Sequence, residues 1–251
     1  MAGHSKWANI KHKKARTDEK RGKAFTKLGK EMIVAAREGG GDPDGNPRLK
    51  LLIQKAKAMN MPNDNINRAI QRGTGEIEGD ALEEINYEGY GPAGVALMLD
   101  ITTDNRNRTA ADIRHLFSKY GGNLGETGCV GWMFKRRGLL EISKTDLEID
   151  LDELELMAIE AGAEDIRGSD DSLEIITEPE TFESVKSSLE EAFKIEWAFA
   201  DITMIPENTV EVTDVETAQK IIKLVDVLED HDDVQDVYAN FSIPDEILGK
   251  I

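Results

Sequence analysis

The spacing of hydrophobic residues predicts that the first part of the chain is helical. From residue 20 to residue 36, apolar side chains recur every three or four positions, as on one face of a helix. A glycine-rich loop at 39–45 ends this helix, and Asn46 followed by Pro47 predicts the start of a second helix that continues to residue 56. A third, short helix is predicted to end at Gly73. These residues therefore form a small three-helix unit preceded by a basic tail.

Beyond a linker rich in glycine and glutamate at 73–84, the pattern predicts alternating strands and helices. Short apolar runs bounded by turn residues predict strands, and three-to-four-residue spacing predicts helices. The predicted strands cover 95–101, 130–134, 139–142, 165–167, 173–176, 197–204, 209–212 and 234–241. The predicted helices cover 107–120, 151–161, 182–193 and 215–228.

These elements fit two α/β units, one nested in the other. Residues 138–207 follow the order βαββαβ of a ferredoxin-like sandwich, and the segments on either side each supply βαβ. The predicted fold class is α+β and multidomain: an N-terminal three-helix domain followed by two ferredoxin-like α/β domains, one inserted in the other. The predicted domains are 1–78, 79–137 plus 208–251, and 138–207. A single continuous sheet is the alternative.

Composition limits the class of protein. No run approaches the roughly 18 uncharged apolar residues of a membrane helix, and the amino terminus lacks the apolar core of a signal peptide. The single cysteine, Cys129, excludes a disulfide framework and a multi-cysteine zinc site. We expect a cytoplasmic protein with no membrane partner.

The net charge of −18 is distributed very unevenly. Residues 1–72 hold 17 basic and 7 acidic side chains, a net charge of +10, whereas residues 138–251 carry a net charge of −25. Salt screens charges over about 8 Å under physiological conditions, so the acidic end would repel a polyanion bound at the basic end only weakly. The asymmetry therefore points to a nucleic-acid partner for the basic end.

Two groups of residues are candidates for binding nucleic acid. The first is the basic run with interleaved aromatic rings, which can hold phosphate and stack on bases: Lys6, Trp7, Lys11, His12, Lys13, Lys14, Arg16, Lys20, Arg21, Lys23 and Lys27. The second is a cluster at a predicted helix start, where free backbone N–H groups favour anions: Asn105, Arg106, Arg108 and Arg114. The alternatives are a solvated basic surface for the first group and simple helix capping for the second.

No catalytic constellation is evident in the sequence. The G-x-G-x-x-G pattern at 89–94 precedes a predicted strand, whereas a dinucleotide site requires it to follow one. Cys129 has no evident base beside it, and its apolar neighbours predict a packed thiol. We therefore predict no enzyme activity, no cofactor and no metal site.

Several segments of the chain closely resemble motifs of the YebC/PmpR family. They are MAGHSKWANIKHKK at 1–14, NPRL at 46–49, AMNMP at 58–62, YEGYGPAGV at 87–95, TDNRNRT at 103–109 and GGNLG at 121–125. The resemblance implies a cytoplasmic protein with one helical and two α/β domains around a cleft, and no enzymatic activity. It carries a binding role onto the lysines and arginines of the first segment and onto Asn105, Arg106 and Arg108.

Family members are described as DNA-binding transcriptional regulators. Mitochondrial relatives act as translational activators, and bacterial relatives have also been placed at the ribosome. The sequence therefore predicts a non-enzymatic, nucleic-acid-binding regulator of gene expression, first as a DNA-binding transcriptional regulator and alternatively as a ribosome- or rRNA-associated translation factor. A protein–protein adaptor is a third hypothesis, because the acidic α/β domains offer a surface for a protein partner.

Overall fold

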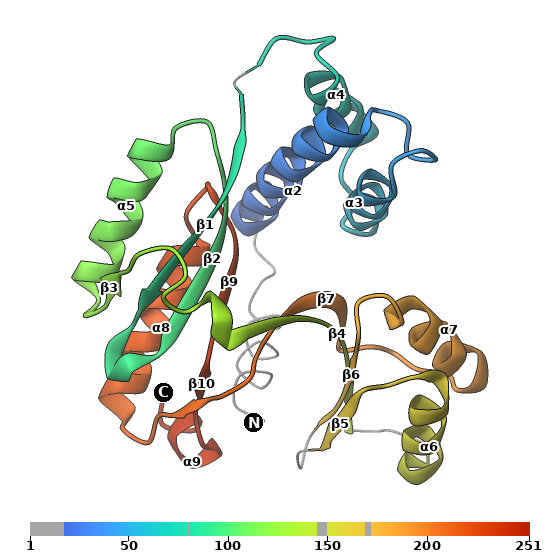
Figure 1. Ribbon diagram of the computed structural model, residues 1–251, viewed down its shortest axis with the longest axis vertical. Helices are drawn as coiled ribbons and strands as arrows, with labels where there is room; N and C mark the ends of the chain where they lie inside the picture. Colours follow the sequence, from blue (N-terminus) through green and yellow to red (C-terminus); the bar gives the residue numbers. More distant parts are fainter. Residues whose placement is uncertain (1–17, 80, 145–149, 169–171) are drawn as a thin grey trace.

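The computed structural model describes residues 18–79, 81–144, 150–168 and 172–251; the side chains of residues 18–20 and 245 are not described (Figure 1). Its first unit is a packed group of three helices, α2 (Asp18–Gly39), α3 (Pro47–Ala58) and α4 (Asn63–Gly73). The Asn46 side chain caps α3 by accepting from the Leu49 amide at 3.0 Å. Its amide group also donates to the Ala35 carbonyl at 2.8 Å, which fixes the loop between α2 and α3. The predicted cap is confirmed.

The second unit is built on an antiparallel sheet with the order β3-β1-β2-β9. Its strands are β1 (Glu83–Tyr90), β2 (Ala96–Thr103), β3 (Asn123–Leu124) and β9 (Val234–Ala239). A short 3-10 helix, η1 (Pro92–Gly94), joins β1 to β2 in a hairpin. Because β9 comes from near the end of the sequence, this sheet combines segments that precede and follow a third unit in the sequence.

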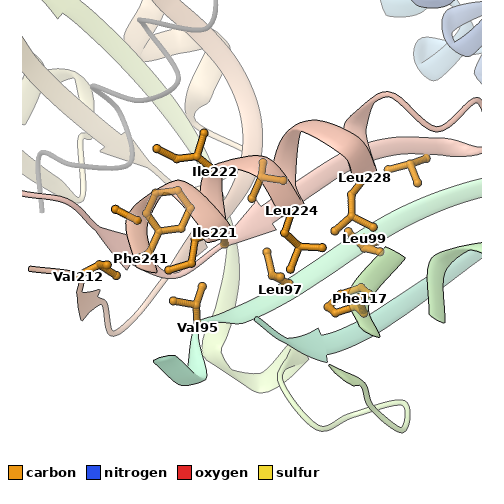
Figure 2. Packing of buried hydrophobic residues seen from close by; sticks show 14 of the residues in the cluster. Val95, Leu97, Leu99, Phe117, Val212, Ile221, Ile222, Leu224, Leu228 and Phe241 are labelled. Atoms are coloured by element: carbon orange, nitrogen blue, oxygen red, sulfur yellow. The ribbon is translucent and has the colours of Figure 1, made fainter. Parts of the chain in front are cut away.

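Two long helices, α5 (Arg106–Lys119) and α8 (Val215–Glu229), pack on one face of this sheet (Figure 1). Leu97 and Leu99 of β2 meet Ile221 and Leu224 of α8, with Phe117 of α5 beside them (Figure 2). All five side chains are completely buried. This cluster is the main hydrophobic core, and it holds α5 and α8 against the sheet.

The third unit has the βαββαβ order that the sequence predicts. Its strands β4 (Phe134–Ser143), β5 (Asp165–Gly168), β6 (Ser172–Thr177) and β7 (Phe199–Pro206) form a sheet with the order β5-β6-β4-β7. Helices α6 (Leu151–Ala161) and α7 (Phe182–Ala192) supply its core together with the sheet. The strand order and connections are those of a ferredoxin-like sandwich. The predicted fold class, a helical unit followed by α/β units, is confirmed.

Two local predictions are wrong, and two strands were not predicted. The predicted strand at 130–134 is mostly a 3-10 helix, η2 (Gly131–Met133), because its amides bond to a side chain rather than to a strand. The strand predicted at 234–241 breaks into β9 and β10 (Phe241–Ser242), and β10 pairs in parallel with β8 (Val210–Glu211). The strands that the sequence analysis did not predict are β1 and β3. The chain ends in α9 (Asp245–Leu248).

The two α/β units meet at a second hydrophobic cluster. Phe134 of β4 and Met204 of β7 pack against Ala96 and Met98 on the sheet face opposite α5 and α8. The domain boundaries at 78, 137 and 207 stay predictions. Strand β4 of the third unit begins at Phe134, before the boundary that the sequence predicts at 137. None of the described helices has the length and hydropathy needed to cross a bilayer.

Candidate nucleic-acid interface

Three lysines of α2 face the carboxyl end of α8: Lys23, Lys27 and Lys30. Lys27 Nζ donates to the Glu229 carbonyl at 2.5 Å, and Lys23 Nζ donates to the Asp230 carbonyl at 3.2 Å. The last carbonyls of a helix lack intrahelical partners and lie at the negative end of its dipole, so they favour cations. These lysines therefore hold α2 against α8, and they are not simply exposed to solvent.

Next to this contact, Asp233 forms the centre of a buried polar cluster. Its side chain is only 5% exposed and accepts hydrogen bonds from Lys30 Nζ at 2.7 Å, Arg108 Nη2 at 2.8 Å and Thr109 Oγ1 at 2.7 Å. Burial by itself raises the pKa of this carboxyl, but the three donors outweigh it and hold the pKa well below its usual range. We call these four residues the Asp233 cluster. It links α2, the start of α5 and the loop after α8.

The second predicted group lies at and after the start of α5, and helix capping explains the position of Asn105. The Asn105 side chain accepts from the Arg108 amide at 3.1 Å, which is an ordinary N-cap. The Arg108 side chain reaches inward to the Asp233 cluster and also bonds to Asp104 at 2.8 Å. Arg106 and Arg114 are exposed. A binding role for these two arginines stays a prediction, whereas Arg108 is already engaged within the protein.

Much of the first predicted group lies outside the described residues: Lys6, Trp7, Lys11, His12, Lys13, Lys14 and Arg16. Lys20 lies in α2, but its side chain is not described. Arg21 is exposed near the start of the same helix. The binding roles of these residues stay predictions.

An open cleft of about 1170 Å³ runs beside the Asp233 cluster. Helices α2 and α4 form one side, and the start of α5 with the 230–233 loop forms the other. Arg68 and Arg72 line the α4 side together with Asn65. Both arginines are exposed, and neither forms a hydrogen bond or ion pair with any residue that the structure describes. The α4 side of the cleft therefore offers two uncommitted guanidinium groups to an anion, whereas the opposite side carries the carboxylates of Asp104, Asp112, Asp230 and Asp232.

The sequence analysis did not single out Arg68 and Arg72. It predicted only a short helix that ends at Gly73; that helix is α4, and it buries Ile66 and Ala69 on its other side. The available signal was the helical spacing of Asn65, Arg68 and Arg72, which places all three on one side of α4. The basic tail has a higher density of positive charge, so it is the stronger signal in the sequence.

A smaller, acidic pocket of about 220 Å³ lies where α2 and α3 approach the open face of the first sheet. It is lined by Glu31, Asp100 and Asp236, with Arg48 paired to Glu84 at its edge. Burial, and then repulsion from Asp236, raises the pKa of Glu31 to about 7. The same two causes raise the pKa of Asp100 to about 6. Ionisation of these carboxyls therefore opposes the contact between the helical unit and the sheet.

Replacing Glu31 with glutamine is expected to stabilise the protein at pH 8 by about 1 to 3 kcal/mol. The folded-state pKa is raised to about 7, so ionisation costs the folded state its full penalty above that pH. The penalty declines as the pH falls through 7 and vanishes below the unfolded pKa of about 4.3. Urea unfolding at pH 8 and at pH 4.5 measures this, and a gain of equal size at both pH values would contradict the assigned cause.

Comparison with known proteins places the chain in a family. Residues 5–76 match the family model of the TACO1/YebC protein N-terminal domain, and residues 82–241 match that of the TACO1/YebC second and third domain. The chain belongs to the TACO1/YebC family. The resemblance seen in the sequence is thereby confirmed.

Similar TACO1/YebC proteins are known from several bacteria. A protein of Syntrophomonas wolfei is 63% identical over 100% of both chains, and one of Halothermothrix orenii is 64% identical over 100% of this chain and 99% of its own. Both are named probable transcriptional regulatory proteins. A conserved hypothetical protein from Aquifex aeolicus, known from its crystal structure, is 51% identical in sequence. The two structures superpose with a TM-score of 0.79, and the match covers 92% of this chain and 94% of that one.

The cleft lies between the segment matched as the TACO1/YebC N-terminal domain and the segment matched as the second and third domain. Its α2 and α4 side belongs to the N-terminal domain, and its α5 side belongs to the segment matched as the second and third domain. The Asp233 cluster joins the same two parts. The cleft therefore keeps its shape only while this junction holds.

Proposed function

We propose that this chain regulates gene expression by binding nucleic acid through its basic N-terminal domain, as a DNA-binding transcriptional regulator. The observation that carries the proposal is the pair Arg68 and Arg72, which line an open cleft without a partner among the described residues. The names of the similar bacterial proteins support the regulatory part. No catalytic step belongs to the proposal.

The proposed contacts are to the phosphate backbone. Guanidinium groups bind phosphate through paired, charge-assisted hydrogen bonds, and each neutralised phosphate releases counterions. Arg68 and Arg72 hold phosphate in the cleft, and the basic tail adds further contacts. Lys23, Lys27 and Lys30 serve the interface indirectly, because their bonds to the end of α8 fix the orientation of the helical unit.

RNA is the second candidate ligand, and the position of the arginines favours it. A helix that reads a DNA duplex enters the wide major groove with its side chains outward. Here α2 turns three lysines toward α8, and the arginines of α4 face a cleft with walls from two units. A single strand or a structured RNA fits such a cleft more easily than a duplex. A ribosome-associated translation factor would use the same residues.

The double variant Arg68→Gln/Arg72→Gln tests this proposal. For duplex DNA we expect about a tenfold loss of affinity and a reduction of about 1.8 in the slope of log K against log salt, because two phosphate contacts disappear. Fluorescence anisotropy with a labelled duplex and a labelled structured RNA measures both quantities. The tighter ligand identifies the class of nucleic acid.

A matched control is Lys220→Gln/Lys223→Gln, which removes the same charge from the exposed side of α8, away from the cleft. We expect it to change the salt slope by far less than the cleft variant. Equal effects of the two variants would show that only net charge matters, and the cleft would lose its assigned role.

The acidic third unit is the proposed surface for a protein partner. Helix α6 exposes Leu156 and Ile159 at 59% and 61% of their surface, next to Glu155 and Glu160. An apolar pair on an acidic helix suits a partner with apolar and basic side chains. The partner and the cytoplasmic location stay predictions.

A further inference from the structure

Trp132 is the most exposed large hydrophobic side chain among the described residues. It lies in η2, just before β4 leads into the third unit, and 65% of its surface is exposed. An indole carries a large apolar face, which usually packs against protein or a ligand. Its exposure therefore calls for a physical explanation.

The loop that carries Trp132 is held by a buried carboxylate. Glu88 of β1 is 6% exposed and accepts backbone hydrogen bonds from Gly128 at 2.7 Å, Val130 at 2.7 Å and Gly131 at 2.6 Å. Burial alone raises the pKa of Glu88, but the three amides outweigh it and the net shift is downward. The carboxylate therefore stays ionised and fixes the backbone on both sides of Cys129.

The indole itself is also held in place. Its Nε1 donates to the Cys129 carbonyl at 3.2 Å, and the Tyr90 hydroxyl donates to the same carbonyl at 3.0 Å. On either side of η2, Val130 and Phe134 are buried in the cluster between the two α/β units. The ring is thus anchored at its edge while most of its surface remains in solvent. Such preorganisation lowers the entropic cost of binding a flat ligand.

Three cations lie three to five residues after Trp132 in the chain. Lys135 forms an ion pair with Glu207, and Arg137 forms one with Glu178. Arg136 is exposed, and its guanidinium makes no hydrogen bond or ion pair with a described residue. Arg136 lies four residues after Trp132 in the sequence, and an aromatic ring together with a free guanidinium can hold an unpaired base and a phosphate of one strand.

We propose that Trp132 is a stacking platform for an unpaired base of single-stranded nucleic acid, with Arg136 contacting a phosphate of the same strand. The proposal rests on the nucleic-acid binding proposed above. It goes further by naming a second contact, in the α/β part of the chain, and by specifying that the base there is unpaired. An apolar protein surface is the competing occupant and is an outcome of the test.

The test compares Trp132→Ala, Trp132→Phe and Arg136→Gln with the full wild-type chain. The probes are an unstructured, labelled 12-nucleotide RNA and a duplex of the same sequence. For the single strand, we expect Trp132→Ala to lose roughly 5- to 150-fold in affinity with an unchanged salt slope, because stacking is worth about 1 to 3 kcal/mol per base. Trp132→Phe keeps most of the affinity. Arg136→Gln lowers the slope by about 0.7.

A duplex has no unpaired base to offer, so its affinity is expected to be the same for wild type and Trp132→Ala. Ile251→Ala, which truncates another exposed apolar side chain, is the matched control and is expected to leave both affinities unchanged. Equal single-strand binding by wild type and Trp132→Ala, or an equal loss on the duplex, would overturn the stacking platform while leaving the proposed function intact. Absence of all binding by the wild-type chain would overturn both.

Discussion

Replacing Asp233 with asparagine is expected to lower the free energy of unfolding at pH 7 by about 2 to 4 kcal/mol. The carboxylate is 5% exposed and accepts from Lys30, Arg108 and Thr109. Asparagine has one acceptor oxygen in place of two, and it leaves Lys30 without a counter-charge and Arg108 with Asp104 alone. Urea unfolding, followed by circular dichroism, measures the loss.

The effect of this substitution is also expected to depend on pH. The folded-state pKa of Asp233 lies well below its usual range, so its stabilising contribution is complete above the unfolded value of about 3.9. The contribution is lost as the pH falls further toward the folded value. The difference between wild type and variant is therefore constant from pH 7 to pH 5 and shrinks below pH 4.

Asp232→Asn is the matched control, because Asp232 is exposed and only its backbone carbonyl contacts Lys30. We expect it to change stability by less than about 0.5 kcal/mol. Hydrogen exchange adds a structural readout: in Asp233→Asn, amides of α2 and α4 are expected to exchange faster, because the junction with α5 and α8 loosens. Unchanged stability and exchange would show that the Asp233 cluster does not hold this junction.

The tail variant Lys11→Glu/Lys13→Glu/Lys14→Glu is expected to lose about 100-fold in affinity for duplex DNA at 0.15 M salt. Removing three phosphate contacts lowers the salt slope by about 2.7, and reversing the charges adds repulsion. Anisotropy titrations at several salt concentrations measure both values. A sucrose gradient of DNase-treated lysate tests the ribosomal alternative with the same variant.

Reversing Lys220 and Lys223 to glutamate provides the control for this experiment, because it changes the net charge on α8 by −4, against −6 for the tail variant. Its loss of affinity is expected to be several-fold at most. If the tail variant binds as tightly as wild type, the tail is not a phosphate contact. If wild type sediments with ribosomes and the tail variant does not, RNA becomes the ligand to pursue.

Local signals in the sequence were sufficient for much of the fold. The predicted helix at 151–161 has the same bounds as α6, and Asn46 caps α3 as its position before Pro47 indicates. These features depend on residues within a few positions of one another. The βαββαβ order of the third unit followed from the same kind of evidence.

Features that depend on distant partners could not be predicted. Strand β1 reads EEINYEGY, too polar for a clear strand pattern, and it forms because β2 pairs with it along its whole length. The sequence around Val130 and Gly131 has the pattern of a strand. In the structure, the amides of both residues donate to the Glu88 carboxylate, about forty residues earlier in the chain. Likewise, Lys27 appears free in the sequence because its partner, the Glu229 carbonyl, lies 202 residues away.

The most direct test of nucleic-acid binding by the N-terminal domain is photocrosslinking on the native full chain. Bound nucleic acid is crosslinked by ultraviolet light, digested, and the modified peptides are identified by mass spectrometry. The proposal predicts nucleotide adducts on peptides from residues 1–17 and from α4, which carries Arg68 and Arg72. Adducts confined to residues 138–207, or no adducts at all, would contradict it.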